Sequence, residues 1–365
     1  MRKILLLLGI LGLAASSLFA AQTTLDFYFI DVEVGNAVLV VTPAGQALLL
    51  DTGPPGEKYV GRLLRAIHTA GVKQIDYAVI SHYHWDHYGT VPELVKSIPI
   101  LHYVDHGTNV DENNTPEHYL MYSGTTIDRQ YRTYAATRDR ADHIVAEPGQ
   151  TIPVKGIDLK ILTSHGDRIL NPLAGAGQVN RVCATTSPRF DDTSEDGQSV
   201  SVLMQFGKFR FADLGDLTWN KSLNLFCPNN LVGRADLYLI SHHGISEERH
   251  SVGEPDWGRS SAPPPEVWGL RPRAAILSAG EDYVGRLSTP EYWQVVHHSP
   301  GLEDIWQLHY QTQGGAANNA PEQFVANMHQ VGDRGFWIKV SAAADGSFTV
   351  TNARNGFTKK YPARK

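Results

Sequence analysis

The chain has 365 residues and a formal net charge of −6 at neutral pH, with 42% apolar and 19% charged residues. This is the composition of an ordinary globular protein, long enough for one large domain or two small ones. No run of lysine or arginine stands out, which argues against sequence-specific nucleic-acid binding and against a clamp on long nucleic acid.

The first 20 residues have the pattern of a secretory signal peptide. Arg2 and Lys3 precede the apolar stretch 4–13, and small residues follow as far as Ala20. That stretch is shorter than the roughly 20 apolar residues of a membrane-spanning helix. We therefore expect cleavage near Ala20 and an exported protein, periplasmic or secreted, with no membrane span after cleavage. An uncleaved membrane anchor is the alternative.

Two cysteines, Cys183 and Cys227, stand far apart in the sequence. In an oxidising compartment such a pair can form one disulfide, and two buried thiols are the alternative. The sequence leaves this choice open, because it does not give the distance between the two side chains.

The first third of the chain predicts strands that alternate with helices. We expect strands at 27–31, 37–42, 46–51 and 75–81. Apolar residues recur on one face from Val60 to Ile67, which predicts a helix that ends at Gly71. The segment from Thr90 to Glu93 has the form of a capping box and predicts the start of a short helix.

Two segments depart from this alternation. A polar segment around 103–146 has weak helical periodicity and is expected to be an insertion. Its tyrosines can line a substrate lid or pack a helix, and both remain open for Tyr119, Tyr122, Tyr131 and Tyr134. A segment around 171–198, rich in Gly, Pro, Asp and Ser, predicts a long surface loop.

The second half of the chain repeats the alternation of strands and helices. We expect a helix near Pro290 and strands at 158–162, 199–205, 209–214, 235–241, 274–278, 336–341 and 347–351. The whole pattern predicts fold class α/β, with two mixed sheets packed together and helices outside. That is a four-layer αββα sandwich, formed as a single domain by residues 21–365.

One loop carries four residues of metal-ligand type within six positions, namely His82, His84, Asp86 and His87. Side chains at alternate positions of an extended loop point the same way, so His82 and His84 can hold one metal ion. After a turn, Asp86 and His87 can face a second ion. Imidazole and carboxylate ligands together suit zinc, and also manganese or iron.

The pattern His-x-His-x-Asp-His after an apolar strand resembles the signature of the metallo-β-lactamase superfamily. Three further features agree with that family in order: a buried strand that ends at Asp51, a strand–Gly–Asp motif that ends at Asp216, and a strand–His motif at His242. The resemblance covers roughly residues 26–350. It implies the four-layer fold and a metal-dependent hydrolase.

Within the superfamily, three segments are most similar to the extracellular metallo-hydrolase domain of ComEC-type competence proteins and its stand-alone secreted relatives: 30–37, 242–244 and 275–280. For those domains phosphodiesters are the favoured substrate class. The resemblance thus implies phosphodiester hydrolysis, although a fold by itself does not fix the substrate.

The resemblance also implies a two-metal centre. Site one would hold His82 and His84, and site two would hold Asp86, His87 and His242. Asp216 would bridge the two ions, and Asp51 would orient a ligand histidine or the bridging water. The nucleophile would be metal-bound hydroxide, without a serine or cysteine nucleophile. His243 can protonate a leaving group or pack against the next helix, and both remain open.

The chain departs from the family pattern in two places. Many members supply a third histidine to site one, but the corresponding stretch 195–199 has none. His165 could be that ligand or a surface-loop histidine, and water or Asp196 could complete the site instead. The ComEC-type His-Pro pair is also absent from 283–288, where Arg286 could hold an anionic group of the substrate.

Three hypotheses follow from these residues. The first is an exported two-metal hydrolase of phosphodiesters with a small-molecule or envelope-derived substrate. The second is a lactone, ester or lactam hydrolase with the same centre. The third is a metal-binding envelope protein that binds one ion and does not turn over. A cationic rim around Arg286 or Arg249 would favour phosphodiesters, and an apolar rim would favour lactones.

Overall fold

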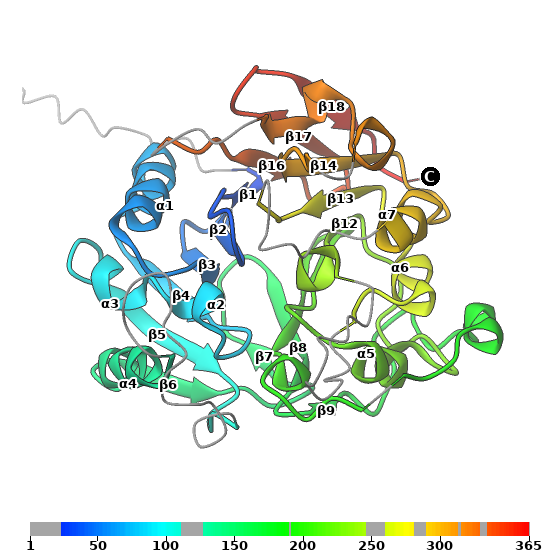
Figure 1. The fold of residues 1–365 in the computed structure, drawn as a ribbon, viewed down its shortest axis with the longest axis horizontal. Helices are drawn as coiled ribbons and strands as arrows, with labels where there is room; N and C mark the ends of the chain where they lie inside the picture. Colours follow the sequence, from blue (N-terminus) through cyan, green and yellow to red (C-terminus); the bar gives the residue numbers. More distant parts are fainter. Residues whose placement is uncertain are drawn as a thin grey trace, which may run out of the picture.

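The computed structural model describes residues 23–110, 127–189, 191–245, 260–280, 290–312, 315–328 and 334–364. Two mixed β-sheets pack face to face, and helices lie on the outer side of each sheet (Figure 1). This architecture confirms the predicted four-layer αββα sandwich. The predicted signal peptide, Arg249 and Arg286 lie outside the described residues.

The first sheet has parallel pairing from β3 to β6 and antiparallel pairing elsewhere. Its strand order is β18 (Thr358–Tyr361), β17 (Phe348–Asn352), β16 (Ile338–Ala342), β1 (Leu25–Phe29), β2 (Ala37–Val41), β3 (Ala47–Thr52), β4 (Ile75–Val79), β5 (Ile100–Asp105) and β6 (Asp142–Val145). The helices of this half are α1 (Glu57–Thr69), α2 (Trp85–Tyr88), α3 (Val91–Leu94) and α4 (Ile127–Arg138).

The second sheet is parallel from β11 to β15 and antiparallel at the other edge. Its order is β15 (Val325–Asn327), β14 (Asp304–His309), β13 (Ala274–Leu277), β12 (Leu237–Leu239), β11 (Phe209–Asp213), β10 (Ser201–Phe206), β8 (Asp158–Ser164) and β7 (Thr151–Ile152), with β9 (Asp167–Arg168) paired to β8. Its helices are α5 (Trp219–Phe226), α6 (Pro264–Leu270) and α7 (Pro290–His297). Short 3-10 helices lie at Arg181–Thr185, Asp196–Gln198, Ser241–Gly244, Ala316–Asn318 and Glu322–Phe324.

The main core lies between the two sheets. Phe27 of β1 contacts Phe211 of β11, with ring centroids 4.9 Å apart, and both side chains are fully buried. A second core lies between the first sheet and its helices, where Leu63 and Ile67 of α1 are buried. Because each helix presents an apolar stripe to a sheet, both faces of both sheets are covered.

The segment expected to be an insertion differs from the prediction. Residues 100–105 and 142–145 form β5 and β6, which extend the first sheet in parallel. Their sequences are partly polar because their exposed positions face solvent, and this weakens the alternation that identifies a strand. Tyr131 and Tyr134 of α4 are buried in the second core, which favours helix packing over a lid. Tyr119 and Tyr122 lie outside the described residues.

The capping box predicted at Thr90 does not form. Thr90 has helical backbone angles and no side-chain cap, and its hydroxyl donates to the carbonyl of Thr52, 2.8 Å away. The hydroxyl therefore joins the short helix to the end of β3 instead of closing the first turn.

Cys183 and Cys227 form a disulfide, with Cα atoms 5.8 Å apart. It joins the segment predicted as a long loop, which contains the 3-10 helix Arg181–Thr185, to the end of α5. Within the described ranges, no helix combines the length and the apolar character needed to cross a membrane.

Candidate metal centre

Histidines and carboxylates from both sheets converge at one edge of the sandwich. Asp51 lies at the end of β3, and the loop 81–87 follows β4. Asp216 follows β11, and His242 and His243 follow β12. The carboxyl ends of parallel strands meet at one edge of a sheet, and packing the two sheets together brings both edges to the same place.

Asp51 fixes the first histidine loop. One carboxylate oxygen accepts the Ser81 backbone N–H at 2.8 Å, and the other lies 2.8 Å from the Ser81 hydroxyl and 2.7 Å from His87 Nδ1. A carboxylate can only accept here, so His87 donates from Nδ1 and presents Nε2 to the centre. This contact fits the predicted orienting role of Asp51.

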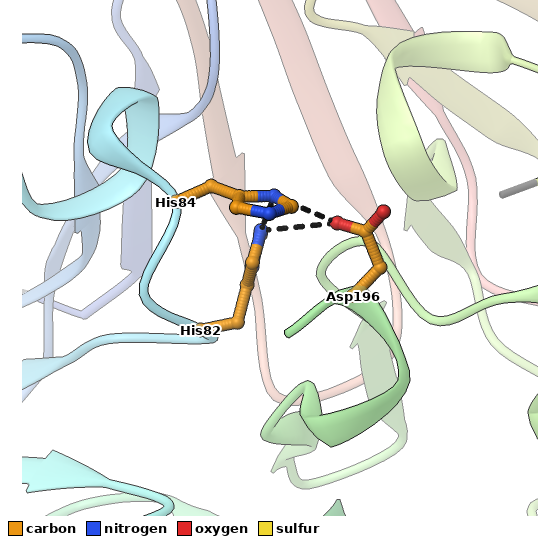
Figure 2. A group of neighbouring side chains, drawn as sticks. All are labelled: His82, His84 and Asp196. Atoms are coloured by element: carbon orange, nitrogen blue, oxygen red, sulfur yellow. Dashed lines mark hydrogen bonds and ion pairs between the residues drawn. The ribbon is translucent and has the colours of Figure 1, made fainter. Parts of the chain in front are cut away.

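His82, His84 and Asp196 form the first group of donors (Figure 2). His84 Nδ1 lies 3.0 Å from His82 Nε2 and 2.8 Å from Asp196 Oδ1, which is itself 3.4 Å from His82 Nε2. Asp196 is fully buried. Asp196 therefore lies beside His82 and His84, where many members of the superfamily have a third histidine.

Asp216 lies between the donor groups. Its Oδ2 is 3.3 Å from His87 Nε2 and 3.9 Å from His82 Nε2. The same oxygen is 3.6 Å from His242 Nε2 and 3.4 Å from His243 Nε2. A single carboxylate that reaches histidines of both sheets has the position expected of a bridging ligand.

The two late histidines differ from the predicted allocation. His243, not His242, groups with Asp86 and His87 within 4.8 Å, whereas His242 groups with Asp196 and Asp216. His243 donates from Nδ1 to the Ser278 carbonyl at 2.9 Å, so its Nε2 lone pair faces the centre. Both residues have positive φ angles, 50° and 53°, and this backbone turn decides which ring faces which group. A sequence pattern does not reveal such a turn.

The electrostatics of the cluster suit cations. Burial, together with neighbouring His87 and His84, holds the pKa of His82 well below its usual value, so this imidazole is neutral. Burial would lower the pKa of His87, but Asp216, Asp51 and Asp86 raise it well above its usual value. Burial and the charge of Asp51 raise the pKa of Asp213, just below the centre, to about 7. The centre thus carries an excess of negative charge.

Asp216 gives a direct test of whether a metal fits. Burial would raise its pKa, but His87, His243 and His242 hold it well below its usual value, so the carboxylate is ionised. Its Oδ1 is buried and accepts no hydrogen bond from the part of the chain that the structure describes. Buried charged oxygens without a donor are costly, and a cation satisfies them. The donor set therefore fits metal ions.

The other predicted residues lie apart from this centre or serve it indirectly. His165 is one-third exposed and its Nε2 lies 3.0 Å from Glu147, so it is a surface-loop histidine.

Glu195 is a residue beside the centre that the sequence analysis did not identify. It is fully buried, accepts the Tyr83 backbone N–H at 2.9 Å and contacts His106 Nε2 at 2.8 Å. Glu195 thereby joins the Asp196 segment to the His82–His84 loop. Its only sequence signal is its place beside Asp196.

Comparison with known proteins supports the superfamily assignment. Residues 30–168 match the family model described as the metallo-beta-lactamase superfamily. The matched segment includes the histidine loop and ends before Asp196, Asp216 and His242. No curated protein matches the chain in sequence.

The solved structures that match this chain share little sequence with it. The metallo-beta-lactamase fold protein YhfI from Bacillus subtilis is 10% identical over 78% of this chain and 96% of its own, with a TM-score of 0.44. CmlA, a diiron beta-hydroxylase from Streptomyces venezuelae, is 13% identical over 76% of this chain, with a TM-score of 0.41; the match spans 49% of CmlA. A HARLDQ-motif mutant metallo-beta-lactamase from Cronobacter sakazakii is 14% identical over 58% of this chain and 75% of its own, with a TM-score of 0.35. The resemblance to ComEC-type domains stays a prediction.

Proposed function

We propose that this protein is an exported hydrolase that uses two divalent metal ions and acts on phosphodiester bonds. The observation that carries the proposal is the convergence of two separate donor groups on the buried carboxylate of Asp216. One group alone would suit a structural ion, whereas two groups that share a carboxylate suit a catalytic pair.

The donors divide into two sites. His82, His84 and Asp196 would hold one ion, and Asp86, His87 and His243 would hold the other. Asp216 would contact both ions, and His242 lies beside Asp196 and Asp216. Two histidines with one carboxylate suit zinc, the expected metal, and also suit iron or manganese.

Bound divalent ions would lower the pKa of a shared water and stabilise negative charge on the attacked group. The chain's own residues prepare this chemistry. Asp51 keeps His87 in the tautomer that presents Nε2, and the Ser278 carbonyl does the same for His243. Because its Nδ1 is held in that way, His243 fits a ligand better than a proton donor.

The phosphodiester assignment rests on sequence motifs and not on the net charge of the centre. Asp51, Asp86, Asp196 and Asp216 supply four negative charges, which two divalent ions balance if the histidines are neutral. The ComEC-type motifs around residues 30–37 and 242–244 favour phosphodiesters over lactones.

Two features support export. The first 20 residues have the pattern of a signal peptide. The Cys183–Cys227 disulfide is typical of proteins that fold in an oxidising compartment.

The test is hydrolysis of bis-p-nitrophenyl phosphate and of a simple lactone by the metal-loaded mature protein. We expect turnover of the phosphodiester, a fall of roughly 10³-fold in Asp216→Ala, and little change in the His165→Ala control. Turnover of the lactone alone would replace the phosphodiester assignment with the lactonase alternative. No turnover of either substrate by a protein that holds only one metal ion would leave a binding role.

A further inference from the structure

A buried carboxylate lies behind the late histidines, outside the donor groups described above. Glu266 of α6 is fully buried. Its Oε1 accepts hydrogen bonds from the Tyr238 hydroxyl at 2.5 Å and the Ser241 hydroxyl at 2.7 Å, and its Oε2 accepts one from the Ser222 hydroxyl at 2.6 Å. Among the described residues, no cationic side chain pairs with it.

Folding stability alone would favour an apolar side chain over a carboxylate at position 266. Removing an ionised group from water is costly, and hydroxyl donors compensate it only in part. Burial accordingly raises the pKa of Glu266, although its three hydroxyl partners oppose that shift. The neighbouring core positions of α6, Val267 and Leu270, are apolar, so a well-packed apolar side chain could fill this place.

The backbone next to this carboxylate is strained. His242 and His243 both have left-handed angles, with φ of 50° and 53°. Such angles are unfavourable for non-glycine residues and persist only where the surroundings fix them. The turn continues at Gly244, where an added Cβ would lie 2.7 Å from the Tyr292 ring, so the chain packs tightly there.

The Glu266 network fixes the residue at the start of this turn. Ser241 gives its hydroxyl to Glu266, and its backbone N–H donates to the Tyr238 hydroxyl at 3.1 Å. The Ser241 carbonyl accepts the Ser261 hydroxyl at 3.1 Å. Each polar group of Ser241 is therefore held, and the next residue in the chain is His242.

We infer that Glu266 is a positioning residue, which acts through Ser241 and Tyr238 to hold the left-handed turn that presents His242 and His243 to Asp216. It contacts none of the donor atoms of the centre. The inference rests on the proposed metal centre, because its effect is to set the angle at which the two rings meet the ions.

The test is titration of the metal-free protein with Co²⁺, whose visible absorption reports the geometry of its ligands. We expect Glu266→Gln and Ser241→Ala to weaken Co²⁺ binding about 10- to 100-fold, the usual effect of residues that orient metal ligands. We also expect an altered visible spectrum in both variants. Ser222→Ala is the matched control, because it removes a hydrogen bond to the same carboxylate on the side away from the turn.

Thermal unfolding of the metal-free variants distinguishes a loss of histidine orientation from a loss of folding stability. If Glu266 only supports the packing of α5 and α6, Glu266→Gln and Ser222→Ala will lower the melting temperature while the Co²⁺ affinity and spectrum stay those of the wild type, and the inference fails. Ser241→Ala keeps the test decisive if Glu266→Gln does not fold. A wild-type protein that binds no Co²⁺ would instead overturn the proposed metal centre itself.

Discussion

The buried carboxylates around Asp31 and those around Asp216 both lie beside histidines, but the chain compensates their negative charge in different ways. Around Asp31 and Glu33, the chain supplies its own cations: Arg62 contacts Asp31 at 2.8 Å and Glu33 at 3.0 Å, and Lys58 contacts Glu33 at 2.5 Å. Around Asp216, the described residues that approach its Oδ2 are the histidines His82, His87, His242 and His243. Both clusters also contain histidine, so the residue types alone do not distinguish them.

The difference shows how a metal centre is separated from a salt-bridge network. Arg62 is buried and fills the space between the carboxylates with a fixed positive charge. Asp216 keeps a buried oxygen without a donor among the described residues. Only the second arrangement needs an added cation, so the grouping of Asp31, Glu33 and His309 does not indicate a second metal site.

Replacing Arg62 should give the largest loss of stability. Arg62→Met would remove the guanidinium from the buried charge of Asp31 and leave His309 as its remaining ion-pair contact, 2.8 Å away. This change should lower the free energy of unfolding by about 3–5 kcal/mol. Chemical denaturation measures this loss. The number of metal ions per chain should stay unchanged, and a variant that loses metal in step with stability would contradict the separation of the two clusters.

Removing metal should destabilise the protein through the other cluster. Chelation leaves the buried Oδ1 of Asp216 without a partner among the described residues. An ion present at 100 times its dissociation constant contributes about 2.7 kcal/mol. Melting curves with and without chelator measure the effect. Arg62→Met should show the same shift on chelation as the wild type, since its own cluster holds no metal. Equal melting curves with and without chelator in the wild type would argue against bound metal.

Asp51→Asn tests how the first histidine loop is oriented. The amide keeps one accepting oxygen where Asp51 uses two, one for the Ser81 N–H and one for His87 Nδ1, so it holds the His87 tautomer less firmly. Metal affinity should therefore fall about 10- to 100-fold. Isothermal titration of the metal-free protein measures it. Asp76→Asn is a suitable control, because Asp76 is a carboxylate of β4 that accepts the Ala47 backbone N–H away from the centre. An equal loss in both variants would indicate damage to the sheet instead.

His165→Ala should have the smallest effect. This side chain contacts Glu147 on the surface and reaches neither donor group. Metal content should be unchanged, and stability should change by less than about 0.5 kcal/mol. If the variant lost one ion per chain, His165 would be the third histidine ligand of site one, which residues 195–199 do not supply.

The local part of the centre could be predicted from sequence, because His82, His84, Asp86 and His87 lie within six positions and spacing alone brings them together. Asp51 could also be located, since it ends a buried strand. Asp196 could not be assigned from sequence, because only the folded chain brings it to within 2.8 Å of His84. The exchange of His242 and His243 depends on two left-handed backbone angles, which no residue pattern specifies.

The fold shows the same division. The buried strand β3 can be predicted because its first four residues, 47–50, form a continuous apolar run, and the structure buries all of its positions. β6 was not, because its positions are exposed or half-exposed at the sheet edge and its pairing with β5 is a tertiary contact. The short helix after Thr90 was expected, but the hydroxyl of Thr90 found a partner in β3 that only the folded chain provides.

Metal content of the purified mature protein, measured beside Asp216→Ala and Asp196→Ala, tests the central claim most directly. We expect two ions per chain in the wild type, loss of the ion at His82 and His84 in Asp196→Ala, and impaired binding of both in Asp216→Ala. A wild type that holds one ion or none under saturating metal, or an Asp216→Ala variant that retains two tightly bound ions, would contradict it.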